Sequence, residues 1–348
     1  MGSAHHDRPK GSKGRMKIFI SGVAGFLGSH IADAMISDGH TVVGCDSMIG
    51  GSLDNVPGEI DFHQVDCNQF DTMARLTDGC DVVYHCAATA YEGLSVFSPH
   101  LITQNVYSAS VSLFSAAIHN RVRRIVFCSS MARYGVNKIP FREDYVAKPE
   151  DPYGIAKVAA EDVLRNLCTI HGIEYTIAVP HNIIGPRQKY DDPYRNVAAI
   201  MINLMLQNRQ PFIYGDGLQK RCFSFVDDCV YCLKEMAFSP KVVGEIINIG
   251  PDEESITVLE LATTLANLLR FNLNPVFMPD RPQEVKLATC ASDKARALLG
   301  YRTSISLTDG LQQMIDYIQN RGLLPFKYHL DLEILNDKTP KTWSDRLL

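Results

Sequence analysis

The 348-residue sequence predicts an α/β protein, a doubly wound parallel sheet with a smaller C-terminal lobe. Through the first half of the chain, short apolar runs rich in β-branched residues alternate with helical patterns of about 10–20 residues. These runs are continuous rather than alternating with polar residues, which is typical of strands buried on both faces of a sheet. Beyond residue 186 the loops lengthen and proline becomes more frequent, which indicates a second lobe.

Six strands are expected in the first half, because their segments are rich in valine, isoleucine, tyrosine and phenylalanine. They span residues 17–23, 40–46, 59–66, 81–87, 123–130 and 174–185. Helical periodicity predicts helices at 25–38 and at about 98–120. A third helix should begin after Asp151-Pro152, since aspartate is a good N-cap and proline suits the first helical turn.

The second half contributes short segments such as 211–215, a strand at 244–250 and helices at 256–270 and 307–321. We expect residues 16–180 to form the first domain, with 226–251 returning to it. Residues 181–225 and 252–348 should form the second lobe. Residues 1–15 are polar and non-periodic, and they are interpreted as a disordered leader or tag.

The composition is that of an ordinary globular chain, with 46% hydrophobic residues and a net charge of −5. This charge gives no general attraction to nucleic acid or to an anionic membrane. No apolar stretch reaches the ~18 residues of a membrane span, and the start lacks the apolar core of a signal peptide. We therefore expect a cytoplasmic protein with neither kind of partner. The basic trio Arg121, Arg123 and Arg124 is interpreted as a solvated loop.

Ten cysteines are scattered along the chain, mostly within apolar runs, as buried free thiols are. Cys229 and Cys232 form one CxxC pair within a helical pattern. A zinc site needs two further ligands at comparable spacing, and the sequence has no second such pair. We therefore expect this pair to pack in the core, and we expect no metal.

A glycine-rich turn, GVAGFLG, directly follows the first predicted strand and opens the first predicted helix. Gly22, Gly25 and Gly28 would permit a tight turn and a close approach of the backbone to a pyrophosphate. The helix start, with Phe26 and Leu27, would then meet the phosphate charge. This strand–turn–helix context predicts a Rossmann-type dinucleotide site.

Two acidic residues follow the next strands. Asp46 ends the second strand, 18 residues after Gly28. A carboxylate there accepts hydrogen bonds from the ribose hydroxyls of NAD and repels the 2′-phosphate of NADP. NAD is therefore the predicted cofactor. Asp66, at the end of the third strand, is a weaker candidate for contact with the adenine edge.

A second group of residues predicts acid–base chemistry. Tyr153 and Lys157 are spaced i, i+4, which puts a phenol and an ammonium on the same helix face. The ammonium, together with a positive nicotinamide ring, would lower the phenol pKa from about 10 and let it act as a base. Ser130 ends the fifth strand at the carboxyl edge of the sheet, where ligands bind, and can hydrogen-bond the reacting oxygen.

These motifs resemble the extended short-chain dehydrogenase/reductase family and, within it, the UDP-hexose 4-epimerases. The resemblance covers about residues 16–320. It is carried by GVAGFLG (22–28), HCAATA (85–90), SVFSP–QN (95–105), SSMARYG (129–135), PYGIAK (152–157), HNIIGPRQ (181–188), IYGDGLQKRCFSFVDD (213–228) and RPQEVK (281–286). It implies NAD-dependent C4 epimerisation of a UDP-sugar through a transient 4-keto sugar. It also implies a homodimer that pairs helices near 98–120 and 151–170.

The resemblance assigns roles to further residues. The serine, tyrosine and lysine above match the family's catalytic triad. Asn182, Arg221 and Arg281 match groups that bind the nucleotide diphosphate, and two arginines and an amide suit that ligand through charge-assisted hydrogen bonds. Asn105 matches a residue that supports the catalytic centre beside the cofactor.

Substrate choice is the finest inference from the resemblance. Seven positions after Arg281 lies Ala288, where the matching residue faces the C2 substituent of the sugar. A small residue there leaves room for an N-acetyl group, so we expect UDP-GlcNAc and UDP-GalNAc to be interconverted. UDP-glucose and UDP-galactose remain open as further substrates. The alternative interpretation is that Ala288 only packs against the core.

Departures from the family pattern bear on other reactions. Sugar 4,6-dehydratases place an Asp-Glu pair after the catalytic hydroxyl, and decarboxylases keep the glutamate. Here those positions hold Met131 and Ala132, which cannot move a proton, so we expect no carboxylate at the sugar. A 4-ketoreductase and a catalytically silent NAD-binding module are further alternatives. Arg133 is unusual at its position and is expected to face either an acidic substituent or solvent.

Overall fold

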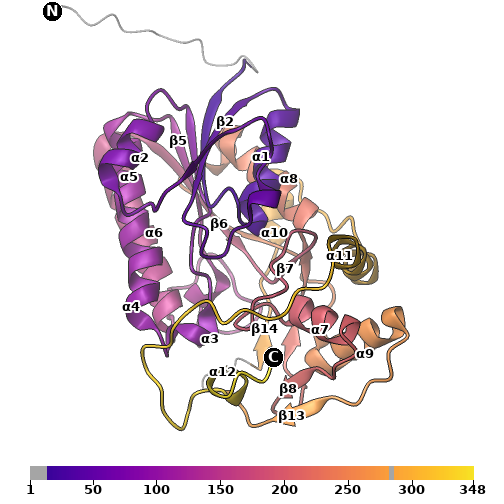
Figure 1. The fold of residues 1–348 in the computed structure, drawn as a ribbon. Helices are drawn as coiled ribbons and strands as arrows, with labels where there is room; N and C mark the ends of the chain where they lie inside the picture. Colours follow the sequence, from indigo (N-terminus) through magenta and orange to yellow (C-terminus); the bar gives the residue numbers. More distant parts are fainter. Residues whose placement is uncertain (1–13, 282–285) are drawn as a thin grey trace, which may run out of the picture.

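A computed structural model of the chain describes residues 14–281 and 286–348, so the expected leader lies almost wholly outside the described residues. Its centre is a seven-stranded sheet whose neighbouring strands all run parallel (Figure 1). The strand order is β11-β6-β5-β4-β1-β2-β3. The order reverses between β1 and β4, which is the switch point where doubly wound sheets bind ligands. The predicted fold class is confirmed.

The strands of the main sheet are shorter than their predicted segments by a few residues at the ends. They are β1 (Lys17–Ser21), β2 (Thr41–Asp46), β3 (Asp61–Gln64), β4 (Val82–His85), β5 (Arg124–Cys128), β6 (Glu174–Pro180) and β11 (Ile246–Ile249). Their side chains are largely buried on both faces, as the continuous apolar runs indicated.

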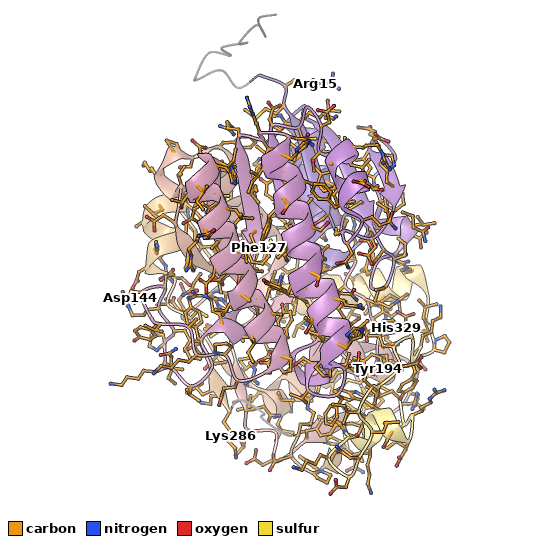
Figure 2. All side chains as sticks on the ribbon, turned by 90° about the vertical axis from the view of Figure 1, so that its left-hand side faces the viewer. Arg15, Phe127, Asp144, Tyr194, Lys286 and His329 are labelled. Carbon is orange, nitrogen blue, oxygen red and sulfur yellow. The ribbon has the colours of Figure 1, made fainter. Side chains whose placement is uncertain are left out.

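Helices cover both faces of this sheet. One layer consists of α2 (Phe70–Leu76), α5 (Ala109–His119) and α6 (Pro152–His171). Figure 2 shows α5 and α6 side by side across that layer. The predicted helix at 98–120 is built from α4 (Pro99–Ile102), the π-helical η2 (Thr103–Ser108) and α5 in succession.

The opposite layer consists of α1 (Phe26–Ser37), α8 (Val226–Phe238) and α10 (Asp293–Leu299). Cys229 and Cys232 lie on α8 and are fully buried against the sheet, which confirms their expected place in the core. Helix α10 packs here although it comes from the range 252–348. Within the described ranges, no helix combines the length and apolar character that a membrane span requires.

The second lobe has a core of its own, formed by α7 (Val197–Leu206), α9 (Val258–Leu269) and α11 (Leu307–Arg321). Short strands surround it. Their pairs are β7 (Ile183–Ile184) with β10 (Ser224–Phe225), β8 (Phe212–Tyr214) with β13 (Val276–Met278), and β9 (Lys220–Arg221) with both β12 (Ile256–Thr257) and β14 (Leu287–Ala288). The remaining short elements are η1 (Leu53–Asn55), α3 (Glu92–Ser95), η3 (Met131–Arg133), η4 (Pro240–Val242) and α12 (Lys341–Ser344).

The interpretation of the basic trio as a solvated loop is wrong for Arg124. This residue begins β5 and is 1% exposed. Its guanidinium donates to the carbonyl oxygens of Met236 and Ser239, both at 2.8 Å, and forms a 2.7 Å ion pair with Glu174. Arg124 therefore satisfies carbonyls at the end of α8 and ties that helix to the sheet.

This contact predicts a loss of stability in Arg124→Met. The buried carbonyl of Met236 and the partly buried carbonyl of Ser239 would lose their donor, at roughly 1–3 kcal/mol each, so the free energy of unfolding should fall by about 3 kcal/mol. Arg121→Met, at an exposed position nearby, should change it by less than about 0.5 kcal/mol. Urea unfolding of both variants checks this, and equal stabilities would contradict it.

Candidate active site

A cavity of about 550 Å³ lies at the carboxyl edge of the main sheet and extends to the second lobe. All of the predicted site residues line it: Gly22, Gly25, Phe26, Leu27, Gly28, Asp46, Asp66, Asn105, Ser130, Tyr153, Lys157, Asn182, Arg221, Arg281 and Ala288. The fold therefore brings the two groups of candidates, which are distant in sequence, to one cavity.

The glycine-rich turn joins β1 to α1 and leaves no room for side chains. A Cβ on Gly28 would lie 2.2 Å from the carbonyl oxygen of Gly22, and Gly22 has a φ of +74°. Helix α1 begins at Phe26 with Gly25 as its N-cap, and no side chain caps its first amides. Backbone N–H groups at such a helix start are suited to bind a phosphate. The turn therefore fits a dinucleotide pyrophosphate.

The ribose end of the cavity contains Asp46, the last residue of β2, which is 7% exposed. Its carboxylate accepts hydrogen bonds from the N–H groups of Ala24 at 3.1 Å and Met48 at 2.8 Å. Burial raises the pKa of this carboxyl, against the effect of those hydrogen bonds. A 2′-phosphate would bring a second negative charge to this buried group, so the residues present fit NAD.

Two other residues predicted to contact the cofactor form hydrogen bonds within the protein. Asp66 accepts a hydrogen bond from the N–H of Asn68 at 2.8 Å. Asn105 donates from Nδ2 to Thr89 Oγ1 at 2.9 Å, and Thr89 also lines the cavity. Asn105 lies in the π-helical η2, a helix type that is frequent at functional sites.

Tyr153 and Lys157 stand on the first turns of α6. The helix begins at Pro152, as predicted, and its N-cap Asp151 accepts a hydrogen bond from the N–H of Gly154 at 2.9 Å. Lys157 Nζ donates to the carbonyl oxygen of Cys128 at 2.7 Å, at the end of β5. The same Nζ lies 5.9 Å from the centre of the Tyr153 ring.

Ser130 lies two residues after the end of β5 and faces Tyr153 in the cavity. Its Oγ accepts a hydrogen bond from the N–H of Ala132 at 3.2 Å, which starts the turn η3. A hydrogen bond between Ser130 and Tyr153 favours the phenolate form of the tyrosine. The three residues of the predicted triad are therefore close neighbours.

Burial has the largest effect on the pKa values of Tyr153 and Lys157. It raises the pKa of Tyr153 to about 12 and lowers the pKa of Lys157 to about 8. Both shifts disfavour the charged form, as expected for groups removed from water. The sequence led us to expect Lys157 as the cation that lowers the phenol pKa. In the structure the charge of Arg195 also acts to lower the phenol pKa.

Arg133 faces neither substrate nor solvent, which corrects the expectation from the sequence. It is 3% exposed, and its Nε and Nη2 donate to the Glu161 carboxylate at 2.9 and 3.0 Å. Glu161 is fully buried on α6 and also accepts a hydrogen bond from Ser129 Oγ at 2.5 Å. This network joins the segment that bears Ser130 to the helix that bears Lys157.

The residues assigned to the nucleotide diphosphate lie at the second-lobe side of the cavity. Asn182 Nδ2 donates to the carbonyl oxygen of Cys222 at 2.9 Å. Arg221, in β9, pairs in register with Ala288, in β14, and Ala288 is 3% exposed. The guanidinium of Arg281 lies 4.6 Å from the centre of the Tyr214 ring.

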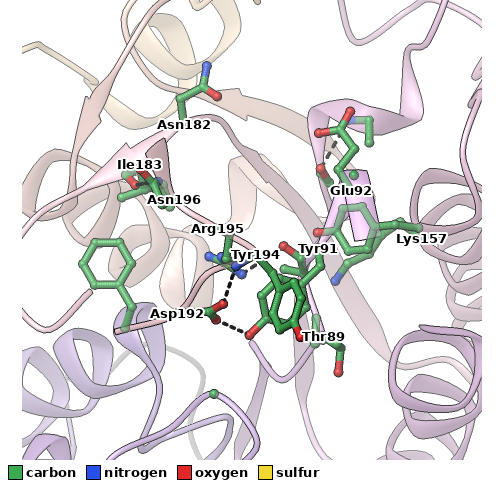
Figure 3. Close-up of a pocket in the computed structure, with 18 of the residues that line it drawn as sticks. Thr89, Tyr91, Glu92, Lys157, Asn182, Ile183, Asp192, Tyr194, Arg195 and Asn196 are labelled. Atoms are coloured by element: carbon green, nitrogen blue, oxygen red, sulfur yellow. Dashed lines mark hydrogen bonds between the residues drawn. The ribbon is translucent and has the colours of Figure 1, made fainter. Parts of the chain in front are cut away.

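Sequence reasoning missed a cluster of residues that also lines the cavity (Figure 3). Tyr91 Oη donates to the buried carboxylate of Asp192 at 2.5 Å. Arg195 Nη1 donates to the carbonyl oxygen of Ala90 at 3.1 Å, and its guanidinium lies 5.6 Å from the centre of the Tyr91 ring. The charged and aromatic run that includes Tyr194 offered a local signal, but its partners lie about a hundred residues earlier.

A carboxylate that the sequence did not predict lines the cavity. Met131 and Ala132 do line the cavity in η3, as apolar residues. Glu92, in the first turn of α3, lines it as well, and its charge acts on Tyr153 to raise the phenol pKa. A carboxylate is therefore present in the cavity, although not at positions 131 and 132.

Comparison with known proteins gives a consistent family. Residues 18–250 match the sequence model of the NAD dependent epimerase/dehydratase family. A UDP-glucose 4-epimerase of Mycolicibacterium smegmatis is 31% identical over 318 residues, which cover 88% of this chain and 100% of that protein.

Solved structures with a similar fold are also named as epimerases. A UDP-glucose 4-epimerase of Thermotoga maritima, crystallised with UDP-glucose, has a TM-score of 0.83 and 30% identity, covering 88% of this chain and 99% of that one. A UDP-N-acetylglucosamine 4-epimerase of Methanobrevibacter ruminantium has a TM-score of 0.83 and 26% identity, with the same coverage. Other similar structures are complexes with NAD.

The cofactor site predicts a preference that calorimetry can measure. NAD should bind roughly 100-fold or more tightly than NADP, because the 2′-phosphate would lie against the Asp46 carboxylate. Asp46→Ala should lower the ratio of the NAD affinity to the NADP affinity by about tenfold or more. Asp71→Ala, at an exposed position on α2, should leave it unchanged. Equal affinity of the unaltered protein for both dinucleotides would refute the assignment.

Proposed function

Because the chain belongs to the NAD dependent epimerase/dehydratase family, we propose that this enzyme epimerises C4 of a UDP-hexose, with UDP-GlcNAc and UDP-GalNAc among its substrates. The observation that carries the proposal is the placement of Tyr153, Ser130 and Lys157 in the same cavity as the glycine-rich turn. The similar structures named as 4-epimerases support the position of the reaction on the sugar.

Tyr153 takes the proton of the C4 hydroxyl, and Ser130 hydrogen-bonds the same oxygen. Burial opposes the phenolate, and the positive charge of Arg195 favours it. In this proposal the ammonium of Lys157 favours it as well. The Lys157 ammonium is charged at neutral pH and loses its proton as the pH rises through about 8. The chemistry that NAD would supply when bound is reversible hydride exchange with C4 of the sugar.

The second lobe holds the nucleotide. Arg221 and Arg281 neutralise the diphosphate, and the amide of Asn182 adds a hydrogen bond. Ala288, in β14, lies beside Arg221, in β9, and leaves space for the C2 substituent of the sugar. In this proposal residues 16–180 and 226–251 bind NAD, and residues 181–225 and 252–348 bind the UDP-sugar.

The protein acts as a homodimer in this proposal. The partner would cover the layer formed by α4, η2, α5 and α6 (Figure 2). Two large apolar side chains of α6 support this, since Ile155 is 54% exposed and Ile170 is 67% exposed.

Glu92 favours a second candidate reaction, the 4,6-dehydration of the sugar. A 4-keto group acidifies the neighbouring C5 proton, and a carboxylate in the cavity is the kind of base that removes it. Met131 and Ala132 argue against this reaction and against decarboxylation. A 4-keto-6-deoxy product or released CO₂ would reveal either, and net oxidation of NADH would reveal a 4-ketoreductase. The intact triad argues against a silent NAD-binding module.

The role of Tyr153 is tested by Tyr153→Phe. This variant should fold and bind NAD yet lose about 10²–10⁴-fold in turnover, because it removes the general base. Chromatography that resolves UDP-GlcNAc from UDP-GalNAc measures the rate. Tyr231→Phe removes a hydroxyl from an exposed tyrosine on α8 and should retain full activity. Turnover of Tyr153→Phe at the unaltered rate would rule out this mechanism.

The role of Ala288 is tested by Ala288→Tyr. The larger side chain should fill the space for the N-acetyl group and reduce turnover of the N-acetylated pair by about tenfold or more relative to UDP-glucose. Ala288→Ser, which is close in size, should keep both activities. Equal loss of both substrate pairs, or no turnover of N-acetylated sugars by the unaltered enzyme, would show that Ala288 does not select the substrate.

A further inference from the structure

The chain is longer than several of the proteins it matches. Alignments that span 98–100% of three curated relatives cover only 88% of this chain, which leaves about 42 of its 348 residues unmatched. Strand β1 begins at Lys17, so residues before the sheet account for fewer than half of these. The segment 325–348, which follows α11, is the main candidate for the rest. We call it the C-terminal strap.

The strap crosses from the second lobe to the first domain and back (Figure 1). Near its start the N–H of Lys327 donates to the carbonyl oxygen of Asp191 at 2.9 Å. Farther along, the carboxylate of Glu333 accepts hydrogen bonds from the N–H groups of His100 and Leu101 at 2.9 and 2.7 Å, which caps α4. Its last part returns to Tyr214 in β8, which hydrogen-bonds Thr342.

The strap packs against aromatic side chains that line the sugar end of the cavity. Trp343 is 5% exposed and contacts Phe97 and Tyr194 edge-on, at 6.1 and 5.6 Å between ring centres. Its indole N–H donates to the carbonyl oxygen of Pro193 at 3.0 Å. Phe97 and Tyr194 line the cavity, and Pro340 of the strap lines it directly.

Further contacts fix the same wall. Tyr194 Oη donates to the carbonyl oxygen of Leu330 at 2.8 Å. His329 Nε2 lies 3.4 Å from Tyr91 Oη, the hydroxyl that is bonded to Asp192. Trp343 also shares one buried cluster with Tyr153. The wall beside the proposed base is therefore built partly from the strap.

An enclosing wall has a specific use in the proposed reaction. The sugar loses a hydride from C4 and a proton from its C4 hydroxyl to become a 4-keto sugar, and the hydride must return to the same molecule. If the ketone leaves early, one NADH stays on the protein for each ketone released. Side chains packed on both sides and hydrogen-bonded to the backbone resist opening, so such a wall favours retention.

We infer that the C-terminal strap is a fixed wall of the sugar site, and that Trp343 and its neighbours act as positioning residues that keep the 4-keto sugar enclosed until it is reduced. This inference rests on the proposed 4-epimerase function. It concerns the fraction of 4-keto sugar that is reduced again before release, not the rate at which the 4-keto sugar forms.

The test compares Trp343→Ala with the unaltered enzyme, each loaded with NAD and given UDP-GlcNAc and UDP-glucose. NADH absorbance and borohydride trapping of free 4-keto sugar are followed along with epimer formation. Trp343→Ala should form roughly tenfold or more NADH per epimer produced, with matching release of ketone. Trp343→Phe should restore retention, because it keeps an aromatic ring between Phe97 and Tyr194.

Two further variants keep the test decisive. Tyr194→Phe removes only the hydroxyl bonded to Leu330 and should also raise NADH per turnover, even if Trp343→Ala fails to fold. Leu335→Ala, at a strap position that is 65% exposed, should behave like the unaltered enzyme. If both wall variants are merely slower, without extra NADH or ketone, the strap has only a structural role and the inference fails. If the unaltered enzyme epimerises neither sugar, the proposed function fails before the strap is tested.

Discussion

The site depends on the hydrogen bond from Lys157 Nζ to the carbonyl oxygen of Cys128. This bond fixes the first turns of α6 against the end of β5, and so fixes Tyr153 relative to Ser130. It also compensates part of the cost of burying an ammonium, a cost visible in the lowered pKa of Lys157. The neighbouring Arg133–Glu161 pair reinforces the same junction.

Enclosure has opposite effects on binding and on acid–base chemistry here. The buried cavity strengthens contacts with charged and polar groups of a ligand, but it raises the pKa of Tyr153. Arg195 counters this effect from a loop of the second lobe, whereas Glu92 adds to it. The pKa of Tyr153 therefore depends on α6, on the loop that holds Arg195 and on the start of α3. These elements lie far apart in the sequence and meet only in the folded chain.

Local patterns in the sequence predicted the parallel sheet, the glycine-rich turn, the start of α6 at Pro152 and the position of Ser130 after β5. Each of these follows from residues close together in the chain. The burial of Arg124 and Arg133 could not be predicted, because their partners Met236 and Glu161 come from other elements. The same holds for Tyr91 with Asp192, and for Trp343 with Phe97. Buried polar contacts over long separations leave no periodicity to detect.

The central claim is that one sugar molecule is oxidised and reduced at C4 within one closed cavity. The most direct measurement uses UDP-GlcNAc carrying deuterium at C4 of the sugar, with the position of the label in the product read by NMR and mass spectrometry. We predict that the UDP-GalNAc formed retains the deuterium at C4, without net formation of NADH. Loss of the label from the epimerised product, or its appearance at another carbon, would contradict it.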